Sequence, residues 1–438
     1  MAHSLLMRFL RPNVVLRPGQ RFIQTSSVRC NENVTPPIST TKQEEFLREY
    51  RIRSTLERLI HHYSSKPLPQ FSLDHLYKQS TSLDKEFLLQ NAQDTVTNLL
   101  IFNARRLQSF RTLPYLVVLN PSISEAYNMY LQSMSLLIGA SYNLPTTLEE
   151  NERFCQDVVT QFIEIHADTL PGLSKGFSEV LPLLSTIGIE KFLGAHLTER
   201  IRMRLVAHQH NSLTASLSNE TEYVPGGRYN GVIKQLNIEG LIKRNADMVN
   251  DITLMKYDQS VNVSIDTNFH PTSFWSKQND TSSKKSTKIP SSEVVFPYID
   301  YHLEYILREL FKNSFRAHIE NNVTDPVQVT ISVSESPSYM ELRIRDKGKG
   351  IPKSAINHMF DYSFSTYESG EGEAYKTLNV PPGLGGNTVA GMGYGLPLSK
   401  NYIEVFNETQ GGGRCKGSLS IQTYPDWGTD VYLKAVGV

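Results

Sequence analysis

Nine consecutive residues in the second half of this 438-residue chain are the most informative: Glu309-Leu310-Phe311-Lys312-Asn313-Ser314-Phe315-Arg316-Ala317. They lie within residues 303–320, where Leu and Ile recur three and four apart, so we predict a helix packed on a sheet. Glu309 and Asn313 are four residues apart and therefore share one helix face. A carboxylate there can take a proton from a hydroxyl group, and an amide oxygen can bind Mg²⁺ beside phosphate. Alone, such a pair is more often part of a solvated helix face.

A second polar patch, Asp346-Lys347-Gly348-Lys349-Gly350, directly follows a strand predicted at residues 339–345. Glycines at alternate positions allow the backbone to approach a flat ligand closely. The carboxylate of Asp346 can accept a hydrogen bond from an exocyclic amino group such as that of adenine. An ordinary glycine-containing turn is the alternative explanation of this patch.

The third patch ends a glycine-rich loop at residues 363–393 and opens a helix predicted at residues 396–406: Gly391-Met392-Gly393-Tyr394-Gly395-Leu396. Backbone N–H groups at a helix start, together with the helix dipole, can hold phosphate. The spacing is not that of a dinucleotide-binding Rossmann motif, and Walker A, HExxH and HRD/DFG sequences are absent. A flexible loop whose turns need glycine would show the same local pattern.

The chain divides into two regions of different character. Residues 42–213 show helical periodicity at 83–107, 122–138, 147–166 and 190–209, which predicts a helical bundle but not its function. Residues 219–438 contain strand-like runs at 253–257, 261–265, 327–333, 339–345, 418–422 and 428–434, so we predict a sheet covered by helices. The polar segment 271–292 has no assigned function.

Composition disfavours several classes of protein. Lys+Arg and Asp+Glu both number 44, so no basic field favours nucleic acid. Cys30, Cys155 and Cys415 form no CxxC pair, which argues against a disulfide framework or a thiolate zinc site. No run of 18 apolar residues predicts a membrane-spanning helix. Residues 1–30 contain arginines and hydroxyl residues but no acid, which predicts a mitochondrial presequence.

The order of the three patches resembles the N box and glycine boxes of the Bergerat-fold ATPases, which include gyrase-type, chaperone, mismatch-repair and histidine-kinase domains. A strand-like run that begins Gly428-Thr429-Asp430 completes the series, and the glycine-rich loop resembles the ATP lid of that group. The resemblance implies an N-terminal helical bundle followed by a Bergerat-type α/β sandwich that binds ATP.

Within that group, the chain is similar to the mitochondrial protein kinases of 2-oxoacid dehydrogenase complexes. Residues 309–317 are nearly the N box of that family, and Ser363-Phe364-Ser365-Thr366 resembles the start of its lid. Further family-like segments occur in the helical half: Leu113-Pro114-Tyr115, Asn120-Pro121, and Arg200-Ile201-Arg202-Met203-Arg204 leading to Gln209-His210.

This resemblance implies a role for each site residue. Glu309 is the expected general base, Asn313 the expected Mg²⁺ ligand, and Asp346 the expected acceptor from the adenine amino group. ATP and Mg²⁺ are the expected cofactors, with direct transfer of phosphate to serine. The other expected nucleotide-lining residues are Leu310, Phe311, Lys312, Ser314, Phe315, Arg316, Gly348, Gly350, Ser365, Thr366, Gly391, Met392, Gly393, Tyr394, Gly395, Leu396 and Thr429.

A regulatory site is implied in the bundle. His166, Arg200 and Arg204 fall where the family binds a 2-oxoacid regulator, and arginines one turn apart suit a carboxylate. Helix-surface cations paired with Glu164 and Glu199 are the alternative explanation.

The sequence thus predicts a mitochondrial matrix protein serine kinase that phosphorylates and inactivates the E1α subunit of the pyruvate dehydrogenase complex. A branched-chain 2-oxoacid dehydrogenase kinase is one alternative, because Tyr305 resembles branched-chain members and Ile163 stands where pyruvate-regulated members carry arginine. A non-catalytic ATP-binding regulatory subunit is another alternative. A sensor histidine kinase is disfavoured, because residues 207–211 of this chain do not form the phosphoacceptor box that such a kinase needs. The expected assembly is a homo- or heterodimer with the E2 lipoyl domain as a further candidate partner, without nucleic acid or a membrane span.

Overall fold

The computed structural model of this chain describes residues 40–69, 71–167, 169–180, 183–184, 186–219, 223–267, 294–335, 338–362, 394–407 and 416–437. The predicted presequence 1–30 and the segment 271–292 lie outside these ranges. So do five of the predicted site residues: Ser365, Thr366, Gly391, Met392 and Gly393.

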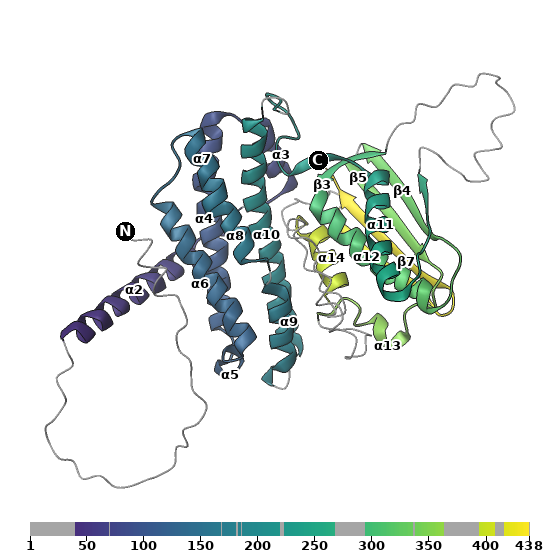
Figure 1. The fold of residues 1–438 in the computed structure, drawn as a ribbon, viewed down its shortest axis with the longest axis horizontal. Helices are drawn as coiled ribbons and strands as arrows, with labels where there is room; N and C mark the ends of the chain where they lie inside the picture. Colours follow the sequence, from purple (N-terminus) through teal and green to yellow (C-terminus); the bar gives the residue numbers. More distant parts are fainter. Residues whose placement is uncertain are drawn as a thin grey trace, which may run out of the picture.

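The first part of the chain is a bundle of helices, drawn from purple to teal in Figure 1. Polar side chains begin several of them: Asp84 accepts a hydrogen bond from the N–H of Phe87, and Thr147 accepts one from Glu150. The predicted bundle is confirmed, although a π-helical segment, η1, interrupts the helix expected at 147–166. The helices are α2 (Thr40–Ser64), α3 (Leu73–Thr81), α4 (Lys85–Arg111), α5 (Tyr115–Val118), α6 (Pro121–Ser141), α7 (Leu148–Phe154), η1 (Cys155–Thr160), α8 (Gln161–Ile165), α9 (Thr169–Glu179) and α10 (Thr186–Ser218).

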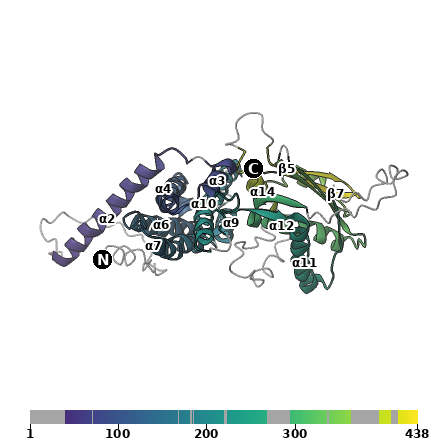
Figure 2. The same cartoon turned by 90° about the horizontal axis from the view of Figure 1, so that it is seen from above.

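The second part is an α/β domain built on a five-stranded sheet in the order β2-β4-β5-β7-β6. Strand β2 pairs parallel with β4, and the other neighbours are antiparallel. The strands are β2 (Val263–Thr267), β4 (Val327–Glu335), β5 (Ser338–Asp346), β6 (Ser418–Tyr424) and β7 (Gly428–Val436), with β1 (Ile233–Asn237) and β3 (Val295–Ile299) as a separate antiparallel pair. On one face of the sheet lie α11 (Ile238–Tyr257), α12 (Asp300–Glu320) and α14 (Gly395–Glu404), and α13 (Lys353–Ile356) follows β5 (Figure 2).

Strand β5 brings a carboxylate to the helix side of this sheet. Met340, Leu342 and Ile344 are buried, whereas Glu341 lies on the opposite face. Because side chains alternate along a strand, Asp346, two residues after Ile344, faces the same side as the buried residues. The end of β5 therefore places this carboxylate beside the helices.

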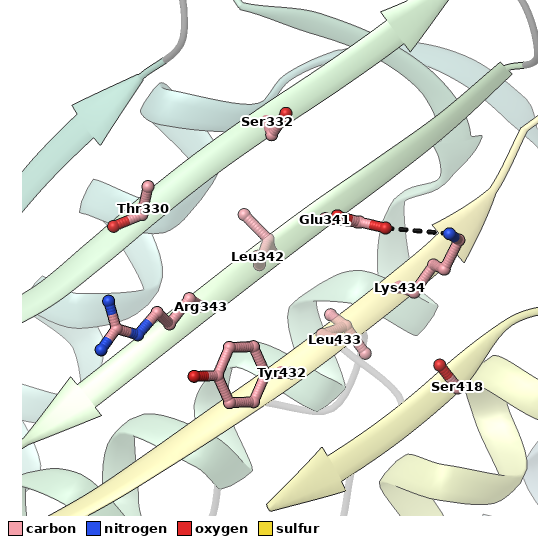
Figure 3. Close-up of a pocket in the computed structure, with 9 residues that line it drawn as sticks. All are labelled: Thr330, Ser332, Glu341, Leu342, Arg343, Ser418, Tyr432, Leu433 and Lys434. Atoms are coloured by element: carbon pink, nitrogen blue, oxygen red, sulfur yellow. Dashed lines mark hydrogen bonds and ion pairs between the residues drawn. The ribbon is translucent and has the colours of Figure 1, made fainter. Parts of the chain in front are cut away.

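The other face of the sheet is polar and is lined by no described helix. A hollow of about 350 Å³ lies on it, and Figure 3 shows its lining residues along β4, β5, β6 and β7. Nζ of Lys434 and Oε1 of Glu341 are 2.8 Å apart across neighbouring strands. The lining residues are Thr330, Ser332, Glu341, Leu342, Arg343, Ser418, Tyr432, Leu433 and Lys434.

The strand predicted at residues 253–257 is wrong, because these residues form the end of helix α11. Leu241, Ile242 and Val249 are buried at helical spacing, and their packing outweighs the local strand-like composition of the last turn. The helix ends at Asp258, which adopts a left-handed conformation with φ of 53°. Strands β1 and β3 were not predicted, since five-residue strands carry little periodicity.

The bundle and the α/β domain are packed directly together through α10 and α14 (Figure 1). Phe71 stacks on Phe406 with ring centroids 5.5 Å apart, and His208 of α10 lies 5.1 Å from Tyr301 of α12. Buried apolar side chains form one cluster that runs through both parts. Helix α10 is therefore a shared boundary of the two. Among the described helices, none is long and apolar enough to cross a membrane.

Candidate active site

Glu309 lies in the middle of α12 and is only 6% exposed. Its Oε1 is ion-paired with Nζ of Lys312, three residues further along the helix. A methyl group added at Gly395 would collide with Oε2 of Glu309, so the start of α14 lies directly against the carboxylate. Burial, followed by the charge of Glu309, raises the pKa of Tyr305 well above its ordinary value, which keeps that hydroxyl protonated. Glu309 is thus an acidic group enclosed between α12 and α14.

The other residues of the nonapeptide divide between the core and the surface. Asn313 is exposed one turn after Glu309, and the Nε of Arg316 is 2.5 Å from Oε1 of Glu320. Ala317 faces the turn that follows β5. Four side chains are buried and hold α12 in place: Leu310, Phe311, Ser314 and Phe315.

Asp346 forms the second centre of the site and is 5% exposed. Its Oδ1 accepts hydrogen bonds from the backbone N–H of Gly348 at 3.0 Å and of Thr429 at 3.2 Å. Burial raises the pKa of this carboxyl to about 6, and the two N–H donors oppose that rise. Since both donors bind Oδ1, the other oxygen is available to a ligand that carries a hydrogen-bond donor.

Glycines allow the backbone around Asp346 to pack this closely. A Cβ at Gly348 would lie 2.8 Å from Cβ of Ala317 on α12, so the turn rests on that helix. Gly428 has φ of 104°, and a Cβ there would overlap the carbonyl oxygen of Asp346. Gly350 also has a positive φ, of 76°. The predicted need for glycine in this turn is thereby explained.

The start of α14 forms the third side of the site. Tyr394 is fully buried, Leu396 is half-buried, and the hydroxyl of Ser399 donates to the carbonyl oxygen of Gly395 at 2.7 Å. Tyr362, which was not predicted, lies 5.6 Å from Tyr394 between ring centroids.

Tyr362 also links the site to the bundle. Nδ2 of Asn401 donates to the Tyr362 hydroxyl at 2.5 Å. On the bundle side, a Cβ at Gly194 of α10 would lie 3.7 Å from the Tyr362 ring. Burial raises the pKa of Glu190, also on α10, and a hydrogen bond from the backbone N–H of Tyr362 partly opposes that rise. These contacts join residues far apart in the sequence, so no local pattern indicated them.

The structure therefore brings together Glu309, Asp346, Thr429 and Gly395 around one region. Helix α12 connects its two ends, because Glu309 contacts the start of α14 and Ala317 contacts the turn after Asp346. A buried carboxylate at each end, with the start of α14 beside Glu309, suits a ligand with a base at one end and phosphates at the other.

The three predicted regulatory residues also lie together, in the bundle. Nη2 of Arg200 donates to the carbonyl oxygens of His166 and Ala167 at 2.7 and 3.3 Å, and Nε2 of His166 is 2.8 Å from the hydroxyl of Ser133. Burial, then the charges of Arg200 and Arg204, lower the pKa of His166 to about 3.

The two arginines are themselves buried, with 4% and 6% exposure for Arg200 and Arg204. Burial and the charge of Arg204 lower the pKa of Arg200 to about 10. Glu199 forms an ion pair with Arg106 of α4, which argues against the alternative that Glu199 neutralises the predicted cluster. Two residues of α6 that contact His166 were not predicted. They are Ser133, through its hydroxyl, and Tyr130, whose ring centroid is 4.6 Å from that of His166.

Comparison with known proteins first defines the class. Residues 300–435 match the family model described as histidine kinase-, DNA gyrase B- and HSP90-like ATPase. The α/β domain is therefore an ATPase domain of the Bergerat type, as the sequence predicted.

Further comparisons then define the family. Residues 70–234 match the model described as mitochondrial branched-chain alpha-ketoacid dehydrogenase kinase. The chain is 32% identical over 405 residues to pyruvate dehydrogenase (acetyl-transferring) kinase 1, mitochondrial, of Saccharomyces cerevisiae, covering 92% of each chain. It is 24% identical to isozyme 1 of Rattus norvegicus and to isozyme 3 of Homo sapiens, over 76% of this chain and 70% and 75% of those relatives. The chain belongs to the family of mitochondrial pyruvate dehydrogenase and branched-chain 2-oxoacid dehydrogenase kinases.

Proposed function

We propose that this chain is a mitochondrial protein serine kinase that uses Mg-ATP to phosphorylate and inactivate the E1α subunit of the pyruvate dehydrogenase complex. The observation that carries the proposal is the placement of two buried carboxylates, Glu309 and Asp346, at opposite ends of one site beside α12. The printed names of the relatives support pyruvate dehydrogenase as the target complex.

At the phosphate end, Glu309 would take the proton of the acceptor serine hydroxyl as its oxygen attacks the γ-phosphorus. Lys312 holds one oxygen of this carboxylate, while the other faces Gly395 at the start of α14. Backbone N–H groups at that helix start would bind phosphate oxygens. The base and the phosphate-binding groups are therefore adjacent, as direct transfer requires.

Asn313 fits the role of a Mg²⁺ ligand. Its amide is exposed one turn from Glu309, and amide oxygens beside phosphate oxygens are donors that Mg²⁺ accepts. When bound there, the ion would neutralise charge on the phosphates. The side chains of Leu310, Phe311 and Phe315 support this face by packing into the core.

At the base end, Asp346 would accept a hydrogen bond from the adenine amino group through Oδ2. Its Oδ1 is already occupied by the N–H groups of Gly348 and Thr429, so the carboxylate is held in one orientation. The same contacts support a place for Thr429 and Gly348 beside the base.

A branched-chain 2-oxoacid dehydrogenase kinase is the second candidate. The observation that favours it is the match of residues 70–234, most of the bundle, to the model named for that kinase. Tyr305, half-buried beside Glu309, is the residue by which the sequence resembles branched-chain members.

Phosphate transfer from labelled ATP distinguishes these candidates. The full chain is incubated with the purified pyruvate and branched-chain dehydrogenase components in separate reactions. We expect label on serine of the pyruvate dehydrogenase E1α subunit. Label confined to the branched-chain component would establish the second candidate, and ATP binding without any transfer would indicate the non-catalytic subunit.

The bundle cluster supports binding of a 2-oxoacid regulator between α6, α8 and α10. Arg200 and Arg204 are buried cations one turn apart, and a carboxylate can neutralise both. We expect Arg200→Met to abolish any effect of pyruvate or a branched-chain 2-oxoacid on transfer. Lys191→Met, an exposed change on the same helix, is the matched control and should leave that effect intact.

The remaining assignments concern location and assembly. Residues 1–30 serve in this proposal as a presequence for the mitochondrial matrix, with a regulatory bundle at 42–213 and a kinase domain at 219–438. The polar face of the sheet, which no described helix lines, is the proposed surface for a homo- or heterodimer, and the E2 lipoyl domain is the proposed docking partner of the bundle. Import assays with a chain starting at residue 31 and sedimentation of the full chain test these points.

A further inference from the structure

A histidine on the catalytic helix holds the turn that follows Asp346. His318 lies on α12, nine residues after Glu309, and its side chain is fully buried. Its Nε2 is 3.0 Å from the backbone nitrogen of Lys347, the residue directly after Asp346. No local sequence pattern indicates this contact, because the two residues are 29 positions apart.

This hydrogen bond fixes the protonation state of the imidazole. A backbone N–H can only donate, so Nε2 of His318 must carry a lone pair, and the ring proton must be on Nδ1. A doubly protonated ring would place an N–H against the N–H of Lys347 and break the contact. The bond therefore exists only while His318 is neutral.

The surroundings of His318 favour that neutral form. Burial, the largest effect, lowers its pKa, and the ammonium of Lys347 acts in the same direction. Asp325, which follows α12, acts in the opposite direction through its backbone and its carboxylate. Nζ of Lys347 is itself 2.9 Å from Oδ2 of Asp325, so these two charges largely offset each other beside the ring.

The contact matters because of what Lys347 connects. The preceding residue is Asp346, and the following residue, Gly348, donates its N–H to Oδ1 of that carboxylate. Gly348 also rests on Ala317, the neighbour of His318 on α12. Two adjacent helix residues thus fix the two residues after Asp346. His318 is nine residues after Glu309, so the two lie roughly 13 Å apart along the helix axis.

We infer that His318 is a positioning residue for the nucleotide: its neutral imidazole holds the Asp346 turn in the conformation that binds the base, and protonation at Nε2 releases the turn. This inference rests on the proposed role of Asp346 in ATP binding. His318 does not touch the nucleotide in this arrangement, so its effect appears in ATP affinity rather than in the rate of transfer.

Two substitutions separate the hydrogen bond from the volume of the side chain. His318→Gln retains an acceptor, since its amide oxygen can replace Nε2, whereas His318→Leu fills the space without one. We expect His318→Leu to raise the Kd and KM for ATP about fivefold to tenfold, the worth of one such bond, with kcat changed less than twofold. His318→Gln should stay within about twofold of wild type in all three.

A pH series provides a readout that loss of packing would not change. ATP affinity of the wild-type chain should fall as the pH decreases, because both His318 and Asp346 become protonated. His318→Gln should retain only the Asp346 component and so show a shallower fall. Identical pH profiles for His318→Gln and wild type would overturn the inference, even if His318→Leu failed to fold.

Two controls keep the outcomes distinct. His210→Leu removes another buried, hydrogen-bonded histidine, in the bundle, and should lower stability without changing the KM for ATP. Asp346→Asn tests the underlying proposal: unchanged ATP binding in that variant would remove the proposed nucleotide site itself. Loss of binding in Asp346→Asn with normal affinity in His318→Leu would overturn the role of His318 alone.

Discussion

Both parts of this protein bury charged groups, but they stabilise these groups by different means. In the α/β domain, Asp346 is bound by backbone N–H groups of Gly348 and Thr429, one in its own turn and one on the neighbouring strand. In the bundle, Arg106 of α4 is neutralised by the side chain of Glu199 of α10. The first arrangement follows from the backbone of two paired strands, and the second depends on how separate helices pack.

This difference indicates how each region responds to change. A carboxylate held by backbone donors keeps its place as long as the strand and its glycine-containing turn keep theirs. When either side chain of a buried ion pair between helices is replaced, the other keeps a charge that neither a partner nor water stabilises. The α/β domain should therefore be sensitive at backbone positions, and the bundle at side-chain pairs.

The largest effect is expected at Glu309, the proposed general base. Glu309→Gln should lower phosphate transfer by about 10²- to 10⁴-fold, because the amide cannot take a proton from the serine hydroxyl. ATP affinity, measured by direct binding, should remain close to that of wild type. Glu304→Gln, the same change on the same helix at a residue paired with Arg308, is the control and should retain transfer. Normal transfer by Glu309→Gln would remove the base assignment.

The Arg106–Glu199 ion pair of the bundle should affect stability rather than phosphate transfer. Glu199→Leu leaves Arg106 buried without its partner and should cost about 3–5 kcal/mol in the free energy of unfolding. The double variant Arg106→Met with Glu199→Leu should recover most of that loss, since no charge is left buried. Urea unfolding of the two variants measures this. Equal destabilisation by the single and double variants would contradict the comparison.

Glycine substitutions compare the backbone of the two regions. Gly428→Ala should cost about 3–4 kcal/mol, because its φ of 104° disfavours a side chain and a Cβ would overlap the carbonyl oxygen of Asp346. Gly172→Ala in α9 has open space around it and should stabilise the chain by about 0.5–1 kcal/mol. Thermal unfolding checks both, and a tolerated Gly428→Ala would show that the turn can relax.

A smaller and opposite effect is expected for Asp346→Asn. Burial raises the pKa of Asp346 from 3.8 to about 6, so the folded state holds a proton more tightly than the unfolded state. Stability from this group is therefore present at low pH and is lost as the pH rises through about 6. The neutral amide should stabilise the nucleotide-free chain by about 2–3 kcal/mol above pH 7, with no gain below about pH 4.

Melting temperatures of wild type and Asp346→Asn at several pH values test this sign. The same variant should lose ATP affinity, because its amide NH₂ would face the adenine amino group. Stability and nucleotide binding would then change in opposite directions at a single residue. A stability gain that did not depend on pH would point to packing rather than to the buried charge.

The helix and strand positions that the sequence predicted correctly are those whose signal is local. Glu309 and Asn313 share a helix face by their spacing, and Asp346 ends a strand with alternating burial, so their placement follows from short segments. The fold class followed from the change from helical to strand-like periodicity near residue 219. The strand prediction at residues 253–257 was wrong because it rested on local composition. It did not take into account the buried helical face of the preceding turns.

What could not be predicted depends on contacts between distant segments. Tyr362 meets Asn401 and Gly194, and His318 meets Lys347, across intervals that no periodicity spans. In the bundle, Ser133 joins His166 from another helix. Helix packing decides these contacts, and a single sequence does not specify it.

Helix α12 imposes one further condition on the chain. Glu309 in its middle and His318 near its end must face their partners at the same time, and each residue of a helix adds about 100° of rotation and 1.5 Å of rise. A substitution between them changes one side chain but leaves this phase unchanged. A one-residue insertion or deletion between positions 310 and 317 would turn one end away from its partner whatever residue was added. We therefore expect the length of this interval to be fixed, in addition to the constraints on residue type at its buried positions and at Lys312 and Asn313.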